Sequence, residues 1–328
     1  MKVLFNVYNT GLGNNGGSLT LVRSANTLLE YGIDVKVVDS GVNQYTWDTL
    51  YAEHIIVKDV EKFPYADIVI ATGMKSVQST LDCSSPIKMH WIRGYETWVY
   101  PEHKLIQILK ESPTIKIVNS LCLEKKLKDN KIGSFIIRPG YDIEDYYPTN
   151  VRTDKIILGG IYNEGSKRKT KRVDWIFKCF SALKSKYKDI ELWMYGAENI
   201  PGLVTYYKKD ANRDEKNYIY NNVSIWLSPS ELEGLHMPPA EAGLTECCVV
   251  GSEAEMSGTQ DYLTHNVTGL VSKDDFDSFI KMVIYALENK EVRQTLGKNL
   301  RTKIISLGSR KDNMYKLLEL MKALRRQK

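Results

Sequence analysis

The chain has 328 residues, of which 43% are hydrophobic and 26% are charged, and its formal net charge is +5. This composition is typical of a soluble globular protein, and the length favours two domains of roughly 150 residues each. No apolar run approaches the roughly 18 residues that a membrane span needs, and the N-terminus becomes polar too soon for a signal peptide. We therefore expect a cytoplasmic protein. The modest positive charge favours anionic small-molecule ligands or an anionic membrane surface over nucleic acid.

The cysteines suggest neither a disulfide framework nor a zinc site. Their number is odd and none shows C-x-x-C spacing. Buried reduced thiols are the expectation for a cytoplasmic protein. The five residues are Cys83, Cys122, Cys179, Cys247 and Cys248.

The N-terminal region predicts the start of a parallel sheet covered by helices. An apolar strand at 2–8 leads through a glycine-rich loop to a helical pattern at 18–31 and a second strand at 35–40. Gly11, Gly13 and Gly16 have G-x-G-x-x-G spacing, and Asp39 ends the second strand, so a dinucleotide site is one interpretation. Polar residues between the strand and Gly11 speak against it. A turn that needs positive φ is another interpretation.

Strands and helices alternate to the end of the first half. The change from apolar to polar character after Met89 predicts that His90 lies at a strand end, where open α/β sheets carry ligand residues. A lone histidine is also commonly structural. Pro148–Asn150 has the composition of an interdomain linker. We therefore expect domains at 1–150 and 151–308, followed by a terminal helix at 309–328 with an apolar stripe from Met314 to Leu324.

The second half repeats this alternation and contains a pair of carboxylates around one loop. A buried strand at 223–227 is followed by a loop and a short helix starting near Pro238. Glu233 lies in the loop and Glu241 one turn inside the helix, with seven residues between them. Pro238 and Pro239 suit a first helical turn, whose free N–H groups attract phosphate. A solvated helix start rich in acidic residues is the simpler interpretation of the pair alone.

The segment EGLHMPPAEAG resembles the E-G-F-G-L-P-x-x-E-A signature of retaining glycosyltransferases of family four, which have the GT-B fold. The matching residues are Glu233, Gly234, Leu235, Pro238, Glu241 and Ala242. The resemblance implies that Glu233 lies against the donor sugar and that Glu241 binds the ribose hydroxyls. It also implies that the main-chain amides of Gly234, Leu235, His236 and Met237 hold the sugar and the diphosphate. His236 and Met237 replace small or aliphatic residues of the family.

Other segments resemble the same family. Lys171-Arg172-Val173-Asp174 is similar to its K-G/R-V-D motif, which implies that Lys171 binds the donor diphosphate. The family's partner arginine is absent after the preceding strand, and Arg168 of the basic loop 163–172 is our candidate to replace it. Gly16-Gly17 resembles a Gly-Gly pair that approaches the diphosphate and acceptor, and His90 takes the place of a histidine that faces the acceptor.

We therefore predict an α/β protein with two Rossmann-like domains facing each other across a cleft, and a C-terminal helix that crosses back to the first. The resemblance implies a retaining, metal-independent glycosyltransferase without a cofactor, with a UDP-sugar donor expected from family frequency. Acceptors left open are a glycan, a lipid carrier and a surface polysaccharide, with peripheral membrane contact as one alternative. The remaining alternatives are a nicotinamide-dependent oxidoreductase or epimerase that uses Gly11, Gly13, Gly16 and Asp39, and a non-catalytic sugar-nucleotide-binding relative.

Overall fold

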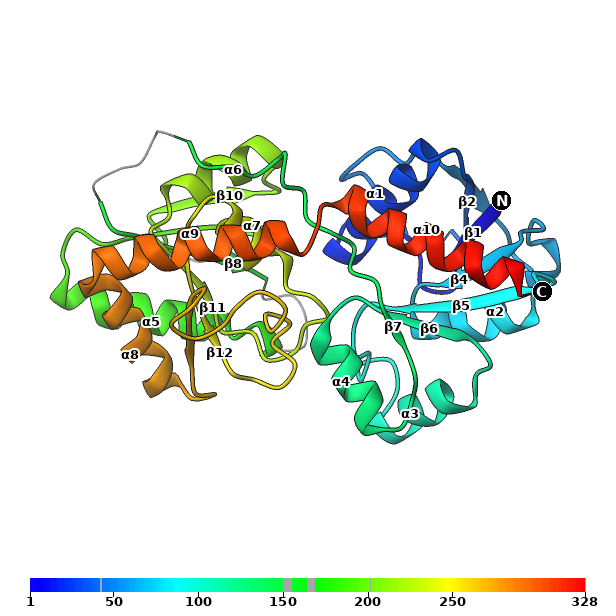
Figure 1. Ribbon diagram of the computed structural model, residues 1–328. Helices are drawn as coiled ribbons and strands as arrows, with labels where there is room; N and C mark the ends of the chain where they lie inside the picture. Colours follow the sequence, from blue (N-terminus) through cyan, green and yellow to red (C-terminus); the bar gives the residue numbers. More distant parts are fainter. Residues whose placement is uncertain (42, 150–154, 164–168, 201, 328) are drawn as a thin grey trace. The chain divides into compact units, whose positions relative to one another are not determined.

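The chain folds into two compact α/β units (Figure 1). The computed structural model describes residues 1–41, 43–149, 155–163, 169–200 and 202–327. One unit comprises Met1–Gly140 and Arg310–Lys328, and the other comprises Tyr141–Ser309. The first boundary comes earlier than the expected position at residue 150, because Tyr141 and Tyr146 are buried in the core of the second unit.

The first unit is built on a seven-stranded parallel sheet in the order β3-β2-β1-β4-β5-β6-β7. Its strands are β1 (Lys2–Asn6), β2 (Asp34–Asp39), β3 (Glu53–Ile56), β4 (Ile68–Ala71), β5 (Ile87–Ile92), β6 (Ile115–Val118) and β7 (Phe135–Ile136). Its α-helices before the boundary are α1 (Gly16–Glu30), α2 (Val77–Asp82), α3 (Glu102–Glu111) and α4 (Leu121–Asp129). The strand order reverses between β1 and β4, so the loops that follow these two strands lie at a topological switch point.

The C-terminal helix α10 (Arg310–Arg326) is part of the first unit. Its residues Met314, Leu317, Leu318 and Met321 are buried in the same hydrophobic core as Leu21 of α1. The hydroxyl of Tyr31 donates a hydrogen bond of 3.0 Å to the carbonyl of Lys311, at the start of the helix. The apolar stripe read from the sequence is therefore buried against protein, which speaks against a helix that lies on a membrane.

The second unit contains a six-stranded parallel sheet in the order β10-β9-β8-β11-β12-β13. Its strands are β8 (Ile157–Tyr162), β9 (Glu191–Gly196), β10 (Tyr206–Lys209), β11 (Ile225–Ser228), β12 (Cys248–Ser252) and β13 (Leu270–Ser272). Its α-helices are α5 (Val173–Lys186), α6 (Arg213–Asn222), α7 (Met237–Leu244), α8 (Phe276–Glu288) and α9 (Lys290–Ser306). A second switch point lies between β8 and β11, which pair in parallel.

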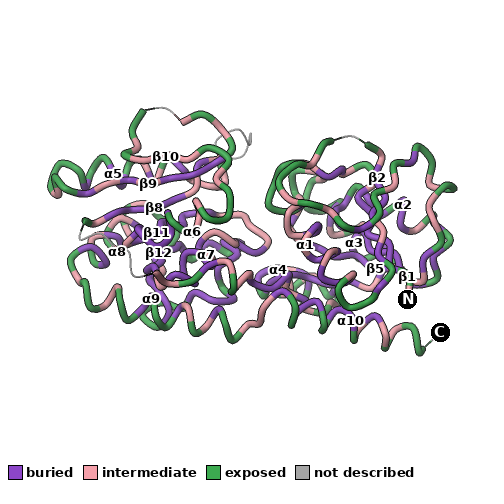
Figure 2. The backbone as a smooth tube through the Cα atoms, turned by 90° about the horizontal axis from the view of Figure 1, so that it is seen from above, coloured by how far each residue is buried: buried purple, intermediate pink, exposed green. Residues whose placement is uncertain are grey.

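Burial follows the pattern expected of parallel sheets. The inner strands are buried almost along their whole length, whereas the helices bury one side (Figure 2). The edge strands β3, β7 and β10 are exposed or only partly buried. All five cysteines are buried, as the sequence predicts, and none of them is in a disulfide. Among the described residues, none of the helices has the combination of length and apolarity that a bilayer span requires.

Close packing of α7 against α9 sets the position of the helix that carries Glu241. A Cβ atom added at Gly297 would lie 2.0 Å from the carbonyl oxygen of Glu246, just after α7. One added at Gly243 would lie 2.6 Å from the side chain of Leu300. Glycine at these positions allows the two helices to approach more closely than side chains would permit.

We predict that Gly297→Ala destabilises the second unit by roughly 1–3 kcal/mol, because the methyl group meets backbone that cannot yield without moving a helix. The gain of roughly 1 kcal/mol in helix propensity opposes this loss. Thermal and urea unfolding would measure the effect. The matched control is Lys298→Ala, one residue further along the same helix on its exposed side, and an equal or higher stability of Gly297→Ala would contradict the packing argument.

Candidate functional site

The candidate site of the second unit lies at the carboxyl ends of β8 and β11. Open α/β sheets bind ligands outside the strand ends at a switch point, where neighbouring loops leave in opposite directions. The loop after β11 carries Glu233 and runs into α7, as the sequence predicts. The described part of the basic loop after β8 begins again at Lys169, so Arg168 lies outside the described residues.

Main-chain hydrogen bonds join the loop after β11 to two different segments. The amide of Glu231 donates to the carbonyl of Thr170 at 2.9 Å. The amide of Glu233 donates to the carbonyl of Met256 at 2.7 Å. The loop is therefore held both by the segment that carries Lys171 and by the turn after β12.

Gly258 completes this turn. Its carbonyl accepts a hydrogen bond of 3.0 Å from the amide of His236, and its φ of 72° lies in the left-handed region. A Cβ atom there would lie 2.7 Å from Cβ of Glu233. Only glycine fits this conformation and this approach without strain. The amide of His236 is consequently engaged with protein and does not match the donor-binding role that the resemblance gave it.

Lys171 and Glu233, which the sequence assigns to the donor site, form an ion pair. The side chains are 23% and 13% exposed, so the pair is largely shielded from water. Burial raises the pKa of Glu233, but the charges of Lys171 and His236 and hydrogen bonds from Lys171 and Ser230 outweigh it and lower the pKa below its usual value. Glu233 is therefore a carboxylate at neutral pH.

His236 lies close to Glu233 as well. Its Nε2 is 3.5 Å from Oε1 of Glu233, and its Nδ1 is 3.1 Å from Oγ of Ser228. Burial lowers the pKa of His236 to about 4, with Glu233 acting in the opposite direction and Lys171 in the same one. The imidazole is therefore neutral at pH 7.

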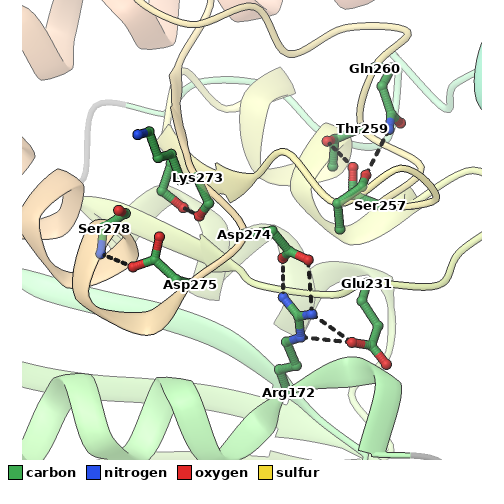
Figure 3. A network of polar contacts seen from close by, with 11 residues as sticks. Arg172, Glu231, Ser257, Thr259, Gln260, Lys273, Asp274, Asp275 and Ser278 are labelled. Carbon is green, nitrogen blue, oxygen red and sulfur yellow. Dashed lines mark hydrogen bonds and ion pairs between the residues drawn. The ribbon is translucent and has the colours of Figure 1, made fainter.

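Arg172 holds the segment that carries Lys171 (Figure 3). Its guanidinium donates a hydrogen bond of 2.6 Å from Nη2 to Oε2 of Glu231. It also donates to both carboxylate oxygens of Asp274. It also lies 4.5 Å from the ring of Trp175, a cation–π contact. The backbone of Arg172 is left-handed, with φ 48°. Because two carboxylates already neutralise Arg172, its charge is committed to the protein rather than to a phosphate.

Glu241 has a different environment from Glu233. It lies on α7, partly buried, and its Oε2 accepts a hydrogen bond of 2.7 Å from the hydroxyl of Tyr220 on α6. The hydroxyl of Tyr220 is in turn 2.6 Å from that of Tyr195 at the end of β9. Neither tyrosine was anticipated from the sequence. The signal that could have located α6 is its capping box, in which Asn212 and Glu215 exchange side-chain and main-chain hydrogen bonds.

The start of α7 supplies few N–H groups. The helix begins at Met237, one residue before the expected position, and Pro238 and Pro239 have no N–H to donate. The main-chain N–H groups of Leu235 and Met237 have no acceptor within the part of the chain that the structure describes. The side chain of Leu235 packs in the hydrophobic core. The donor-binding roles of Gly234, Leu235 and Met237 stay predictions.

Gly16 and Gly17 begin α1 at the switch point of the first unit. The carbonyl of Gly17 accepts a hydrogen bond from Nη1 of Arg93, whose Nη2 donates to the carbonyl of Thr72 at 2.9 Å. Arg93 therefore links the start of α1 to the loop after β4. A Cβ atom at Gly16 would meet nothing within 4 Å. The geometry leaves room beside Gly16, and the ligand contact of both glycines stays a prediction.

The prediction that His90 lies at a strand end is wrong. β5 continues through Trp91 to Ile92, both of them buried apolar residues that extend the strand. The side chain of His90 is 1% exposed. Burial, with the positive charges of Lys116 and Arg93, lowers its pKa to about 3. His90 is thus a neutral histidine inside the strand, and its contact with an acceptor stays a prediction.

The geometry does not favour the nicotinamide alternative. The carboxylate of Asp39 is fully buried and accepts hydrogen bonds from the amides of Gly41, at 3.0 Å, and Leu12, at 3.4 Å. It also lies 3.2 Å from Nε2 of His54. A dinucleotide site needs the acidic side chain to be free to bind a ribose, whereas Asp39 is bound to protein. It also needs a helix that starts within the glycine turn, whereas α1 starts only at Gly16.

Solved structures share this fold at low sequence identity. Sucrose-phosphate synthase from Thermosynechococcus elongatus aligns over 100% of both chains at 14% identity, with a TM-score of 0.81. HepE from Anabaena, solved with UDP and glucose, aligns over 98% of this chain and 100% of its own at 13% identity, with a TM-score of 0.75. HepE has also been solved with UDP-glucose. TarM from S. aureus, solved as a mutant with fondaparinux, alpha-GlcNAc-glycerol and UDP, aligns over 77% of this chain and 55% of its own at 16% identity, with a TM-score of 0.64.

The fold is therefore that of GT-B proteins, with two Rossmann-like units, which confirms the fold class predicted from the sequence. Residues 161–303 match the family model of glycosyl transferases group 1. The matched residues make up most of the second unit, and the match identifies the protein as a glycosyltransferase. No curated protein sequence matches the chain.

The two buried neutral histidines predict a pH dependence of stability. The ordinary pKa of histidine in an unfolded chain is about 6.5, above the folded values of His90 and His236. Between about pH 4 and 6.5 the unfolded state therefore binds protons that the folded state does not, so stability rises with pH across this window. Each histidine contributes at most roughly 1.4 kcal/mol per pH unit.

We predict that His90→Gln and His236→Gln each flatten the rise of the unfolding midpoint between pH 4.5 and 6.5, because each removes a group that takes up a proton only on unfolding. Chemical unfolding at several pH values would measure the slope. His103→Gln is the control, since His103 is exposed on α3. A slope unchanged in both test variants would show that these side chains take up protons in the folded state as readily as in the unfolded one.

Proposed function

We propose that this glycosyltransferase moves a sugar from a nucleoside-diphosphate sugar to an acceptor hydroxyl with retention of the anomeric configuration. The observation that carries the proposal is the ion pair of Lys171 and Glu233 at the switch point, with Glu241 on the helix that follows. The two glutamates match the family signature, and the lysine supplies a positive charge beside the first of them. Together they offer separate partners for phosphate, sugar and ribose.

In this proposal the diphosphate, the sugar and the ribose each bind a different residue, chosen by its charge. The ammonium of Lys171 takes the diphosphate, because it is the cation of the described basic loop that lies beside the signature carboxylate. Glu233 accepts hydrogen bonds from the sugar hydroxyls, and Glu241 accepts them from the ribose. The N–H groups of Leu235 and Met237, which have no acceptor in the described chain, add donors at the positive end of α7. Arg168 remains our candidate for a second cation at the phosphates.

The chemical step requires the bond between the anomeric carbon and the phosphate oxygen to break while a bond to the acceptor oxygen forms on the same face. The leaving diphosphate gains negative charge, which Lys171 stabilises. The acceptor hydroxyl loses its proton to the departing phosphate oxygen. Charge neutralisation by side-chain cations and helix N–H groups is the basis for proposing transfer without a metal.

The nature of the substrates is also part of the proposal. HepE was solved with UDP-glucose and TarM with UDP and sugar compounds, which supports a UDP-sugar donor and a glycan acceptor for this chain. A lipid carrier and a surface polysaccharide are the other acceptors to test. A cytoplasmic location, with peripheral contact to an anionic membrane, fits the net charge of +5.

The test is sugar release and sugar transfer from a panel of UDP, GDP and ADP sugars, with and without EDTA. We expect activity with at least one donor that persists in EDTA and yields a product of unchanged anomeric configuration by NMR. Activity abolished by EDTA and restored by a divalent cation would overturn the metal-independent part. An inverted product would overturn the retaining part.

We predict that Lys171→Ala lowers kcat by about 10²–10³, because one preorganised positive group at a developing negative charge is lost. Lys128→Ala is the matched control, since Lys128 is exposed on α4 in the other unit. Steady-state kinetics with the best donor would measure both. Equal and small effects would mean that Lys171 serves only the ion pair with Glu233.

We predict that Glu233→Ala loses transfer activity while its affinity for the free nucleoside diphosphate is kept or increased. The sugar contact disappears, whereas Lys171 loses the carboxylate that competes with phosphate for its ammonium. Calorimetry with the free diphosphate, beside transfer assays, separates the two effects. A large loss of diphosphate affinity together with activity would assign Glu233 to the nucleotide instead of the sugar.

A further inference from the structure

Two buried tyrosines hold one of the two signature glutamates. The hydroxyl of Tyr220 is 2.7 Å from Oε2 of Glu241, and a carboxylate can only accept a hydrogen bond, so Tyr220 is the donor. Tyr220 has then given away its only hydroxyl proton. Consequently Tyr195, whose hydroxyl is 2.6 Å away, must donate to Tyr220. The direction of this relay from Tyr195 through Tyr220 to Glu241 follows from donor and acceptor capacity alone.

The surroundings keep both tyrosines in place as neutral donors. Tyr220 is fully buried and Tyr195 is 5% exposed. The ring of Tyr220 packs edge-on against Trp226, at 5.0 Å, and against Tyr146, at 5.5 Å. Burial, followed by the negative charge of Glu241, raises the pKa of both hydroxyls well above the usual value. Both hydroxyls therefore keep their protons in the physiological pH range.

Glu241 is left with one oxygen for a ligand. Within the described chain it forms no ion pair, and its Oε1 has no hydrogen-bond partner there. The residue is also only partly buried, whereas both tyrosines behind it are closed off from solvent. A carboxylate tied at one oxygen to a rigid aromatic cluster has lost most of its rotational freedom before a ligand arrives.

We propose that Tyr220 is a positioning residue for ribose recognition, which it achieves by fixing the carboxylate of Glu241, and that Tyr195 supports it by fixing the hydroxyl of Tyr220. This inference rests on the proposed function, in which Glu241 binds the ribose hydroxyls. It assigns a role to α6 and β9, which the signature motif does not include. The relay makes the nucleotide end of the donor site depend on two residues that do not touch the ligand.

The test compares a nucleoside diphosphate with its 2′,3′-dideoxy form, which lacks both ribose hydroxyls. The probe is UDP, or whichever of UDP, GDP and ADP binds best, and calorimetry gives both dissociation constants. In the wild type we expect the dideoxy form to bind at least about tenfold more weakly, because hydrogen bonds to a charged group are lost. Glu241→Gln should bring the ratio of the two dissociation constants, dideoxy form over ribose form, close to one.

Tyr220→Phe keeps the ring and its aromatic contacts but removes the donor. We expect the ratio to fall by about three- to tenfold, with the ribose form weakened and the dideoxy form unchanged, because only the ribose form uses the orientation of Glu241. Tyr195→Phe should act in the same direction and more weakly. Tyr207→Phe is the control, since its hydroxyl donates to the carbonyl of Glu198 in the same unit.

The outcomes separate the inference from the function on which it rests. A wild-type ratio retained in Glu241→Gln overturns the ribose assignment itself. A ratio lost in Glu241→Gln but retained in Tyr220→Phe overturns the positioning role, as does an equal weakening of both ligands in Tyr220→Phe. If Tyr220→Phe does not fold, Tyr195→Phe decides the matter, because a selective loss for the ribose form supports the relay and an unchanged ratio overturns it.

Discussion

The candidate site depends on the hydrogen bonds that hold the loop after β11. A connection between a strand and a helix is ordinarily among the more mobile parts of a parallel sheet. Here the amides of Glu231 and Glu233 are bound by carbonyl groups of two separate segments, from Thr170 and Met256. Because both ends of this short stretch are bonded to other parts of the fold, the backbone positions that carry the carboxylates of Glu231 and Glu233 are fixed. The arrangement of the charged groups therefore rests on main-chain contacts as well as on the ion pairs themselves.

Two adjacent cations pair with different carboxylates of this loop and so avoid competing for one partner. Lys171 pairs with Glu233, and Arg172 pairs with Glu231 and Asp274. The fork of donors on a guanidinium suits two carboxylates at once, whereas an ammonium is a compact charge that a phosphate can reach. The arginine consequently serves as the structural cation, and the lysine is the one suited to exchange its partner. Exchanging these two residue types would place the more strongly committed cation beside the signature glutamate.

The sequence was sufficient for the elements whose signals are local. The strand, loop and helix around Glu233 and the stripe from Met314 to Leu324 follow from periodicity and turn residues, and the family signature adds the fold class. The polarity of His90 is a misleading signal for the end of a strand, because β5 continues to Ile92. Tyr220 and the partners of Arg172 could not be found, since their contacts join segments that only the tertiary fold brings together. The capping box of Asn212 and Glu215 marks the start of α6, but no local pattern predicts which residues its buried side contacts.

The two glutamates of the signature end up with opposite kinds of support, and this difference bears on what each can do. Glu233 is held by a cation, so part of its charge is already neutralised and a ligand must compete with, or replace, that cation. Glu241 is held by a neutral hydroxyl, so its full negative charge stays available while its orientation is fixed. Sugar hydroxyls at either residue are weak neutral donors, for which orientation matters more than net charge. A carboxylate held by a tyrosine hydroxyl can therefore recognise the ribose, which does not change during transfer. A carboxylate held by a lysine ammonium is suited to the sugar end of the nucleotide sugar, where charge is redistributed during transfer.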